Sequence, residues 1–259
     1  MKDVYVQMFS FEDRAPESTF QNLKTAAEIG YTGVELYGPN LKVDPKELKK
    51  ALEETGLQAV SLHTGVEDIV RCIPIAKELG MSYVGIGSYD MPDFDALKRF
   101  LKLLKEAGEE CRKNGLVLTY HNHTQEFRTA EGKTFLQHIL DETDPAVIAL
   151  EIDAGWCVGA GTDPIGFVKE HSGRVQLVHI KECAKVIGVC PTGDIMPRIH
   201  ELNCLPGKGL IDWEKFIPAA REHGCRSFIV ERETTYDGAA DRIQCLREDF
   251  AYYSGLNIE

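Results

Sequence analysis

Short apolar runs alternate with longer amphipathic stretches along most of the chain. Each run is rich in β-branched or aromatic residues, and each following stretch spaces its apolar residues three and four apart. The runs predict eight strands, over residues 4–9, 33–37, 58–63, 83–87, 117–123, 148–153, 175–181 and 227–233. The stretches between them predict helices, among them residues 45–55, 95–114, 212–222 and 240–253.

Helix boundary signals agree with this pattern. Asp44 and Pro45 are typical of a helix start, and Gly56 is typical of a helix end. Strands that alternate with helices favour parallel pairing through right-handed crossovers. Eight such units predict an α/β chain folded as a single (β/α)₈ TIM barrel, one domain over residues 1–259. A long irregular interval, residues 182–209, follows the seventh strand and is predicted to form a lid or a substrate wall.

Composition and charge narrow the class of protein. The 43% of hydrophobic residues suffice for a large core, while 41 acidic and 29 basic residues leave a net charge of −12. This charge argues against a nucleic-acid partner. The chain start lacks the pattern of a secretory signal, and no apolar run reaches about 18 residues. We therefore expect a cytoplasmic protein that does not enter a membrane.

Eight cysteines are spread along the chain, and none forms a CxxC pair. Their density is far below that of disulfide scaffolds. We interpret them as reduced thiols, the alternatives being a disulfide framework or a structural zinc site.

Ionisable residues gather where the predicted strands end, which is where a TIM barrel has its active site. Side chains repeat every two residues on a strand, so neighbouring pairs of these residues share a face. Carboxylates and imidazoles that converge from several strands favour one divalent metal ion with open positions for water or substrate. The residues are Glu35, His63, His121, His123, Glu126, Asp153, His179, Lys181, Glu231 and Glu233.

Five stretches contain most of these strand ends: YHNHTQEF (120–127), LEIDAGWCVGAGTDP (150–164), GRVQLVHIKE (173–182), GKGLIDW (207–213) and FIVERE (228–233). In this order they resemble the sugar isomerase/epimerase proteins of the xylose isomerase-like barrel superfamily. The resemblance implies one divalent ion (Mn, Mg, Co or Zn) held from the last four strands by Glu126, Asp153, His179 and Glu231. Some relatives place the first carboxylate within strand five, at a position resembling Thr119, so a neighbouring strand-five residue is the alternative to Glu126.

Each ligand assignment has a structural alternative. Asp153 could instead cap the following helix, and His179 could be a hydrogen-bonded core histidine. Glu231 could pair with Arg232 or Arg242 as an ordinary surface charge, and Glu126 could be a solvated loop residue.

The remaining candidates are assigned to substrate binding. His121 and His123 could instead bond strand-end carbonyls, and Trp156 could be ordinary core packing rather than a wall for a sugar face. Lys208, between two glycines, marks either a phosphate site or a turn before a helix cap. The full set is Glu35, His63, His121, His123, Trp156, Lys181 and Lys208.

These groups suit proton transfer beside a carbonyl of a small carbohydrate. A ketose, keto-glycoside or inosose would bind the metal, Glu231 or Glu126 would remove the proton, and Lys181 would polarise an oxygen. The result would be epimerisation or isomerisation through an enediolate. If a hydroxyl lies β to the carbonyl, the same site would act as a dehydratase.

Two other classes fit less well. Endonuclease IV shares the superfamily barrel, but such an enzyme needs further zinc ligands and a basic DNA-binding face. A binding protein without catalytic activity would not need the four ligands. Relatives often form dimers or tetramers, so a homo-oligomer is one expectation.

Overall fold

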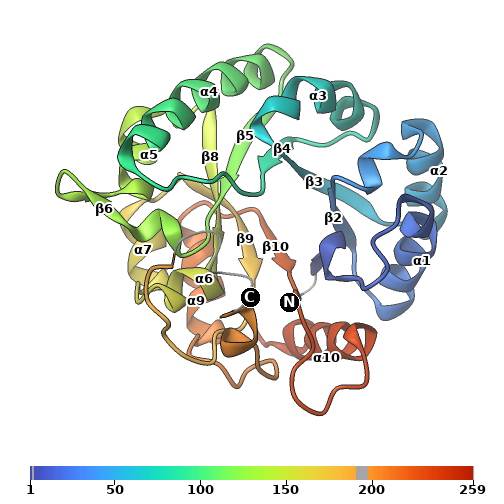
Figure 1. The fold of residues 1–259 in the computed structure, drawn as a ribbon. Helices are drawn as coiled ribbons and strands as arrows, with labels where there is room; N and C mark the ends of the chain where they lie inside the picture. The colour runs from blue at the N-terminus through green and yellow to red at the C-terminus, as the bar shows by residue number, and fades with distance from the viewer. Residues whose placement is uncertain (2, 191–197, 259) are drawn as a thin grey trace.

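Eight parallel strands form a closed barrel in a computed structural model that describes residues 1, 3–190 and 198–258 (Figure 1). The strands follow one another around the barrel in the order β1-β10-β9-β8-β5-β4-β3-β2. This confirms the predicted fold class, and each of the eight predicted strands overlaps one barrel strand. Their bounds are β1 Tyr5–Gln7, β2 Gly33–Tyr37, β3 Gln58–Thr64, β4 Tyr83–Ile86, β5 Val117–His121, β8 Ile148–Asp153, β9 Val175–Ile180 and β10 Ser227–Val230.

Helices surround the strands, and a small hairpin of β6 (Thr129–Ala130) and β7 (Lys133–Thr134) stands outside the barrel (Figure 1). Helix α2 has the bounds predicted for it, because the Asp44 carboxylate accepts hydrogen bonds from two amides of its first turn. The helices are α1 Thr19–Ile29, α2 Pro45–Thr55, α3 Ile69–Glu78, α4 Phe94–Lys113, α5 Phe135–Glu142, α6 Ala154–Gly159, α7 Pro164–Glu170, α9 Trp213–Glu222 and α10 Arg242–Gly255. Short 3₁₀ helices are η1 Met8–Ser10, η2 Pro16–Ser18, η3 Asn40–Lys42, η4 Val66–Asp68 and η5 Gln125–Phe127.

Some strands end earlier than the sequence pattern predicts, and this places site residues on turns above the barrel. Strand β10 ends at Val230, so Glu231 and Glu233 follow it. The Glu231 amide still donates to the Ile180 carbonyl at 3.1 Å, and the next amide turns away to the Ser10 hydroxyl at 2.9 Å. Beyond that point the chain has left the edge of the neighbouring strand.

The strand register brings polar residues side by side inside the barrel. Asp153 is paired with His179, and His121 is paired with Glu151. All four side chains are buried. The C-terminal part of the barrel interior is therefore polar, and the residues that face the helices form the apolar core.

Strand β4 makes room for a site residue instead of supplying one. A Cβ atom at Gly85 would lie 2.7 Å from the His63 ring and 3.0 Å from the Thr119 hydroxyl. A Cβ atom at Gly87 would lie 2.9 Å from His63 Nδ1. These glycines leave the space that the His63 ring fills.

All eight cysteines are free thiols, which agrees with the prediction of reduced side chains. Among the described residues we find no helix with the length and apolar character needed to cross a membrane. The single-domain extent, the cytoplasmic location and the oligomeric state stay predictions. Part of the expected lid, residues 191–197, lies outside the described residues.

The glycine at position 85 gives a test of this packing. We expect Gly85→Ala to lower the free energy of unfolding by about 1–3 kcal/mol, because the added methyl group overlaps the His63 ring. Urea denaturation would measure the change. Gly255→Ala is the matched control, since a Cβ atom there meets nothing within 4 Å. Equal stability of the two variants would contradict this account of β4.

Candidate active site

An open pocket of about 310 Å³ lies at the C-terminal ends of the strands, at the lower end of the size range of small-molecule sites. Phe9 and Tyr37 form its apolar side, with ring centroids 5.5 Å apart and planes at 85°. The rest of its lining is mainly polar. The lining residues are Gln7, Phe9, Tyr37, Gly38, His63, Thr64, Gly65, Gly87, Ser88, His121, His123, Glu231 and Glu233.

Four ligand-type side chains converge beside this pocket, and we call them the upper cluster: His121, Asp153, His179 and Glu231. They come from β5, β8, β9 and the turn after β10, and their ligand atoms lie within 4.8 Å of one another. His121 Nε2 is 3.5 Å from Asp153 Oδ2, and His179 Nδ1 is 3.3 Å from Glu231 Oε2.

Each residue of the upper cluster has one buried atom that makes no aligned hydrogen bond within the described chain, and the two carboxylate atoms among them form ion pairs with Lys181. These atoms are His121 Nε2, Asp153 Oδ2, His179 Nδ1 and Glu231 Oε2. An unsatisfied buried polar atom costs about 1–3 kcal/mol, and the two imidazole nitrogens have no aligned hydrogen-bond partner in the described chain. Two imidazole nitrogens and two carboxylate oxygens are a suitable donor set for a divalent cation, and the residues present therefore fit one.

His121 and Asp153 each use their other polar atom to fix their orientation. His121 Nδ1 lies 3.1 Å from the Gly87 carbonyl, which only accepts, so the ring proton is on Nδ1 and Nε2 is free. Asp153 Oδ1 accepts from the Trp156 amide at 2.8 Å and caps α6. The cap and the ligand were alternatives in the sequence, whereas the structure gives Asp153 one oxygen for each purpose.

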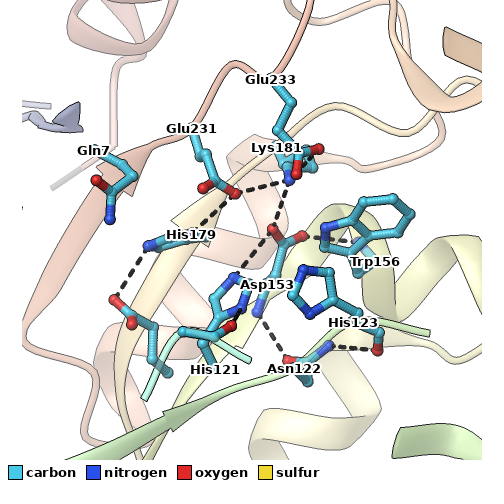
Figure 2. A network of polar contacts seen from close by, with 12 residues as sticks. Gln7, His121, Asn122, His123, Asp153, Trp156, His179, Lys181, Glu231 and Glu233 are labelled. Carbon is cyan, nitrogen blue, oxygen red and sulfur yellow. Dashed lines mark hydrogen bonds and ion pairs between the residues drawn. The ribbon is translucent and has the colours of Figure 1, made fainter. Parts of the chain in front are cut away.

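Lys181 lies beside the upper cluster and contacts three carboxylates (Figure 2). Its Nζ is 2.7 Å from Glu231, 2.6 Å from Glu233 and 3.3 Å from Asp153. Burial lowers the pKa of Lys181, but these carboxylates raise it well above its ordinary value. The side chain is therefore a permanent ammonium group.

Two side chains of the pocket wall have pKa values shifted in favour of their neutral forms. Burial raises the pKa of Glu233 to about 7, although Lys181 opposes the shift. Burial, together with the nearby His121 and Lys181, lowers the pKa of His123 to about 3. At neutral pH His123 is thus a neutral imidazole, while Glu233 exchanges a proton easily.

A second group of four lies deeper in the barrel, and we call it the lower cluster: Glu35, His63, Glu151 and His179. His63 Nε2 is 2.5 Å from Glu151 Oε2, and His179 Nε2 is 2.6 Å from Glu35 Oε2. Burial lowers the pKa values of both histidines, but the two carboxylates, with Glu231 near His179, raise them above the ordinary value. The lower cluster is thus a set of charge-compensated hydrogen bonds.

Glu126 does not join the other predicted metal ligands. It lies in η5, and its carboxylate accepts from the Tyr120 hydroxyl at 2.7 Å, the His123 amide at 2.8 Å and Gln125 at 3.0 Å. Tyr120 faces outward from β5, so Glu126 is drawn behind the strand instead of into the mouth. Strand five contributes His121 to the upper cluster in its place.

Glu231 is not paired with its neighbouring arginine, which was the structural alternative for it. Arg232 turns to the opposite side, where its Nε donates to the Asp249 carboxylate of α10 at 2.9 Å. Both partners are buried. This ion pair fixes α10 to the end of β10 and leaves Glu231 directed at the pocket.

Trp156 does not line the pocket. Its side chain is fully buried, its ring lies 5.5 Å from that of His123, and the Lys181 ammonium is 4.8 Å from its centroid. The indole therefore supports two site residues from behind. The apolar wall expected from it is formed by Phe9 and Tyr37 instead.

Lys208 is exposed, and the glycines beside it do not form a phosphate site. Their amides donate to the Glu182 carboxylate, Gly207 at 2.6 Å and Gly209 at 3.2 Å. The same carboxylate accepts from Trp213 Nε1 at 2.8 Å. An internal anion therefore occupies the place of a phosphate, and the turn was the correct alternative.

Several site residues were missed by the sequence reasoning. Glu151 precedes Asp153 by two residues, so the period of a strand could have placed both inside the barrel. No comparable sequence pattern could have identified Gln7 as a site residue. Phe9 and Tyr37 could be recognised only once the turns after β1 and β2 were known.

The barrel and the clusters at its mouth define the class of protein. Residues 23–249 match the family of xylose isomerase-like TIM barrels. The chain belongs to this family.

Curated relatives and solved structures agree with this assignment. The chain is 26% identical to an inosose dehydratase of Bacillus cereus (strain AH820) over 199 residues, which span 71% of this chain and 65% of that protein. It is 24% identical to an inosose dehydratase of Bacillus anthracis over 250 residues, 84% of this chain and 83% of that protein. A sugar phosphate isomerase/epimerase from Parabacteroides distasonis ATCC 8503 superimposes with a TM-score of 0.80 at 22% identity, over 97% of this chain and 93% of that one.

The position of Glu126 leads to a direct test. We expect Glu126→Gln to lower the free energy of unfolding by about 1–3 kcal/mol, because the amide keeps only one acceptor oxygen for the three buried donors and turns its NH₂ group to at least one of them. The variant should bind as much divalent cation as the wild type. Denaturation and elemental analysis would measure the two quantities. Loss of the cation would return Glu126 to the metal ligands.

Proposed function

We propose that this protein is a divalent-metal-dependent epimerase or isomerase of a sugar or keto-sugar. The observation that carries the proposal is the upper cluster, in which two imidazole nitrogens and two carboxylate oxygens from three strands and the turn after β10 lie within 4.8 Å of one another beside the pocket. The family assignment supports it, and a D-allulose 3-epimerase from Methylomonas sp. shares the fold with a TM-score of 0.73 at 15% identity, over 97% of this chain and 96% of that one.

In this proposal His121, Asp153, His179 and Glu231 hold the cation. When bound, the ion supplies Lewis acidity to a substrate carbonyl and an adjacent hydroxyl. Mn, Mg, Co and Zn all remain candidates.

Other side chains of the site are assigned proton transfer, charge stabilisation and the binding of substrate hydroxyl groups. Glu233 lines the pocket and replaces Glu126 as the second candidate base, so Glu231 and Glu233 are the carboxylates that can move a carbon-bound proton. Lys181 cannot accept a proton, and its ammonium group stabilises negative charge on a substrate oxygen. His63 and His123 bind hydroxyl groups of the substrate.

A dehydratase is the second candidate, because curated relatives at 24–26% identity are inosose dehydratases. The same proton removal would start the reaction. A hydroxyl β to the carbonyl would then leave as water, with a proton from Glu233. An inosose or a 3-keto-glycoside has the required arrangement.

Metal analysis tests the cation site. We expect about one divalent ion per purified wild-type chain and none in an Asp153→Ala/His179→Ala double variant, because half of the donor set is then missing. Glu126→Gln serves as a folded control. Equal metal in the wild type and the double variant would overturn the site.

Turnover in D₂O tests the chemistry. We expect ketohexoses, 3-keto-glycosides or inososes incubated with Mn²⁺ to acquire deuterium beside the carbonyl, and Glu233→Gln to lower kcat by about 100-fold or more. A new epimer identifies the first candidate, and water loss with an ultraviolet-absorbing product identifies the second. A product without solvent deuterium would indicate hydride transfer and contradict both.

A further inference from the structure

We propose that Glu35 is a positioning residue that holds the His179 ring with its proton on Nε2, so that Nδ1 is the atom presented to the cation. The inference rests on the proposed cation site. It assigns a role to a buried carboxylate outside the upper cluster.

His179 belongs to both clusters, and its two nitrogens have different surroundings. Nε2 is 2.6 Å from Glu35 Oε2 and 3.3 Å from Glu151 Oε1. Nδ1 points to Glu231 Oε2 at 3.3 Å and has no hydrogen bond within the described chain (Figure 2). An ionised carboxylate only accepts, so the hydrogen bond to Glu35 requires the proton on Nε2. A metal-binding nitrogen must carry no proton, which leaves Nδ1 for the cation.

Glu35 is itself fixed in place by neighbours from two strands. Gln7 Nε2 of β1 donates to Glu35 Oε2 at 2.6 Å, and the Ser61 hydroxyl of β3 donates to Oε1. The glutamate side chain is completely buried. A carboxylate with these donors and no access to water cannot rotate away from His179.

Neighbouring rings restrict the plane of His179. The His63 ring is stacked on it at 5.3 Å and 22°, and the His121 ring lies 4.5 Å away at 56°. His63 is in turn held to Glu151 at 2.5 Å. The lower cluster thus fixes the plane of the His179 ring and determines that Nδ1 is the nitrogen that faces the upper cluster.

The lower cluster itself is better explained by hydrogen bonds than by a second cation. His63 Nε2 contacts Glu151 Oε2, and His179 Nε2 contacts Glu35 Oε2, both within hydrogen-bond distance, which places a proton between the atoms of each pair. Gln7 and Ser61 already donate to both oxygens of Glu35. The proposal therefore predicts one cation per chain, bound at the upper cluster.

A matched pair of variants tests the role of Glu35. We expect Glu35→Gln to weaken Zn²⁺ binding by about 10- to 100-fold, the usual effect of losing a carboxylate that orients a ligating histidine. Glu126→Gln is the control, because Glu126 is equally buried and accepts several hydrogen bonds outside both clusters. Competition with a chromophoric chelator would measure both affinities. Wild-type affinity in Glu35→Gln would overturn the inference, as would an equal loss in the control.

The tautomer can be read from the wild-type protein, so the test does not depend on the folding of a variant. We expect ¹⁵N spectra of the Zn²⁺-loaded, histidine-labelled protein to show the His179 proton on Nε2. A proton on Nδ1 would overturn the inference. If the wild type binds no Zn²⁺, the proposed function fails together with this inference. If it binds Zn²⁺ and Glu35→Gln binds it equally well, only this inference fails.

Discussion

Buried negative charge is the constraint on which the rest of this structure depends. Glu35, Glu151, Asp153 and Glu231 are all buried in one half of the barrel interior, and a buried ion is tolerated only with a partner. Lys181 and the histidines of the two clusters supply part of the compensation. In the described chain the facing atoms of His121, Asp153, His179 and Glu231 still lack aligned hydrogen bonds, and they lie within 4.8 Å of one another beside the pocket. The proposed cation completes a charge balance that the chain alone leaves unfinished.

Anchors outside the pocket hold the mouth of the barrel in shape. The buried pair of Arg232 and Asp249 joins the end of β10 to α10, and Glu182 binds the turn at residues 207–209 together with Trp213. Each anchor is next in sequence to a site residue, since Arg232 follows Glu231 and Glu182 follows Lys181. Successive side chains of an extended chain point to opposite sides. At the ends of β9 and β10 one side chain therefore faces the site, and the next one anchors the surrounding structure.

The sequence was sufficient to predict the barrel, because the alternation of strands and helices is a local pattern that repeats eight times. It also predicted Asp153, His179 and Glu231 as neighbours, since strand ends meet at one edge of a parallel barrel. It failed at Glu126, whose direction depends on a turn and on the outward side of Tyr120. The partners of Glu35 could not be foreseen either, because its hydrogen bond to His179 joins residues 144 positions apart.

The carboxylate of Glu182 has a consequence for molecular recognition. Backbone amides after the seventh strand of a TIM barrel commonly bind the phosphate of a ligand. Here the amides of Gly207 and Gly209 already donate to the Glu182 carboxylate. A ligand thus gains no affinity from that corner. Under the proposed function, discrimination among sugars would depend on the hydroxyl groups that face Gln7, His63, His123 and Glu233 in the pocket, and not on a phosphate group at this turn.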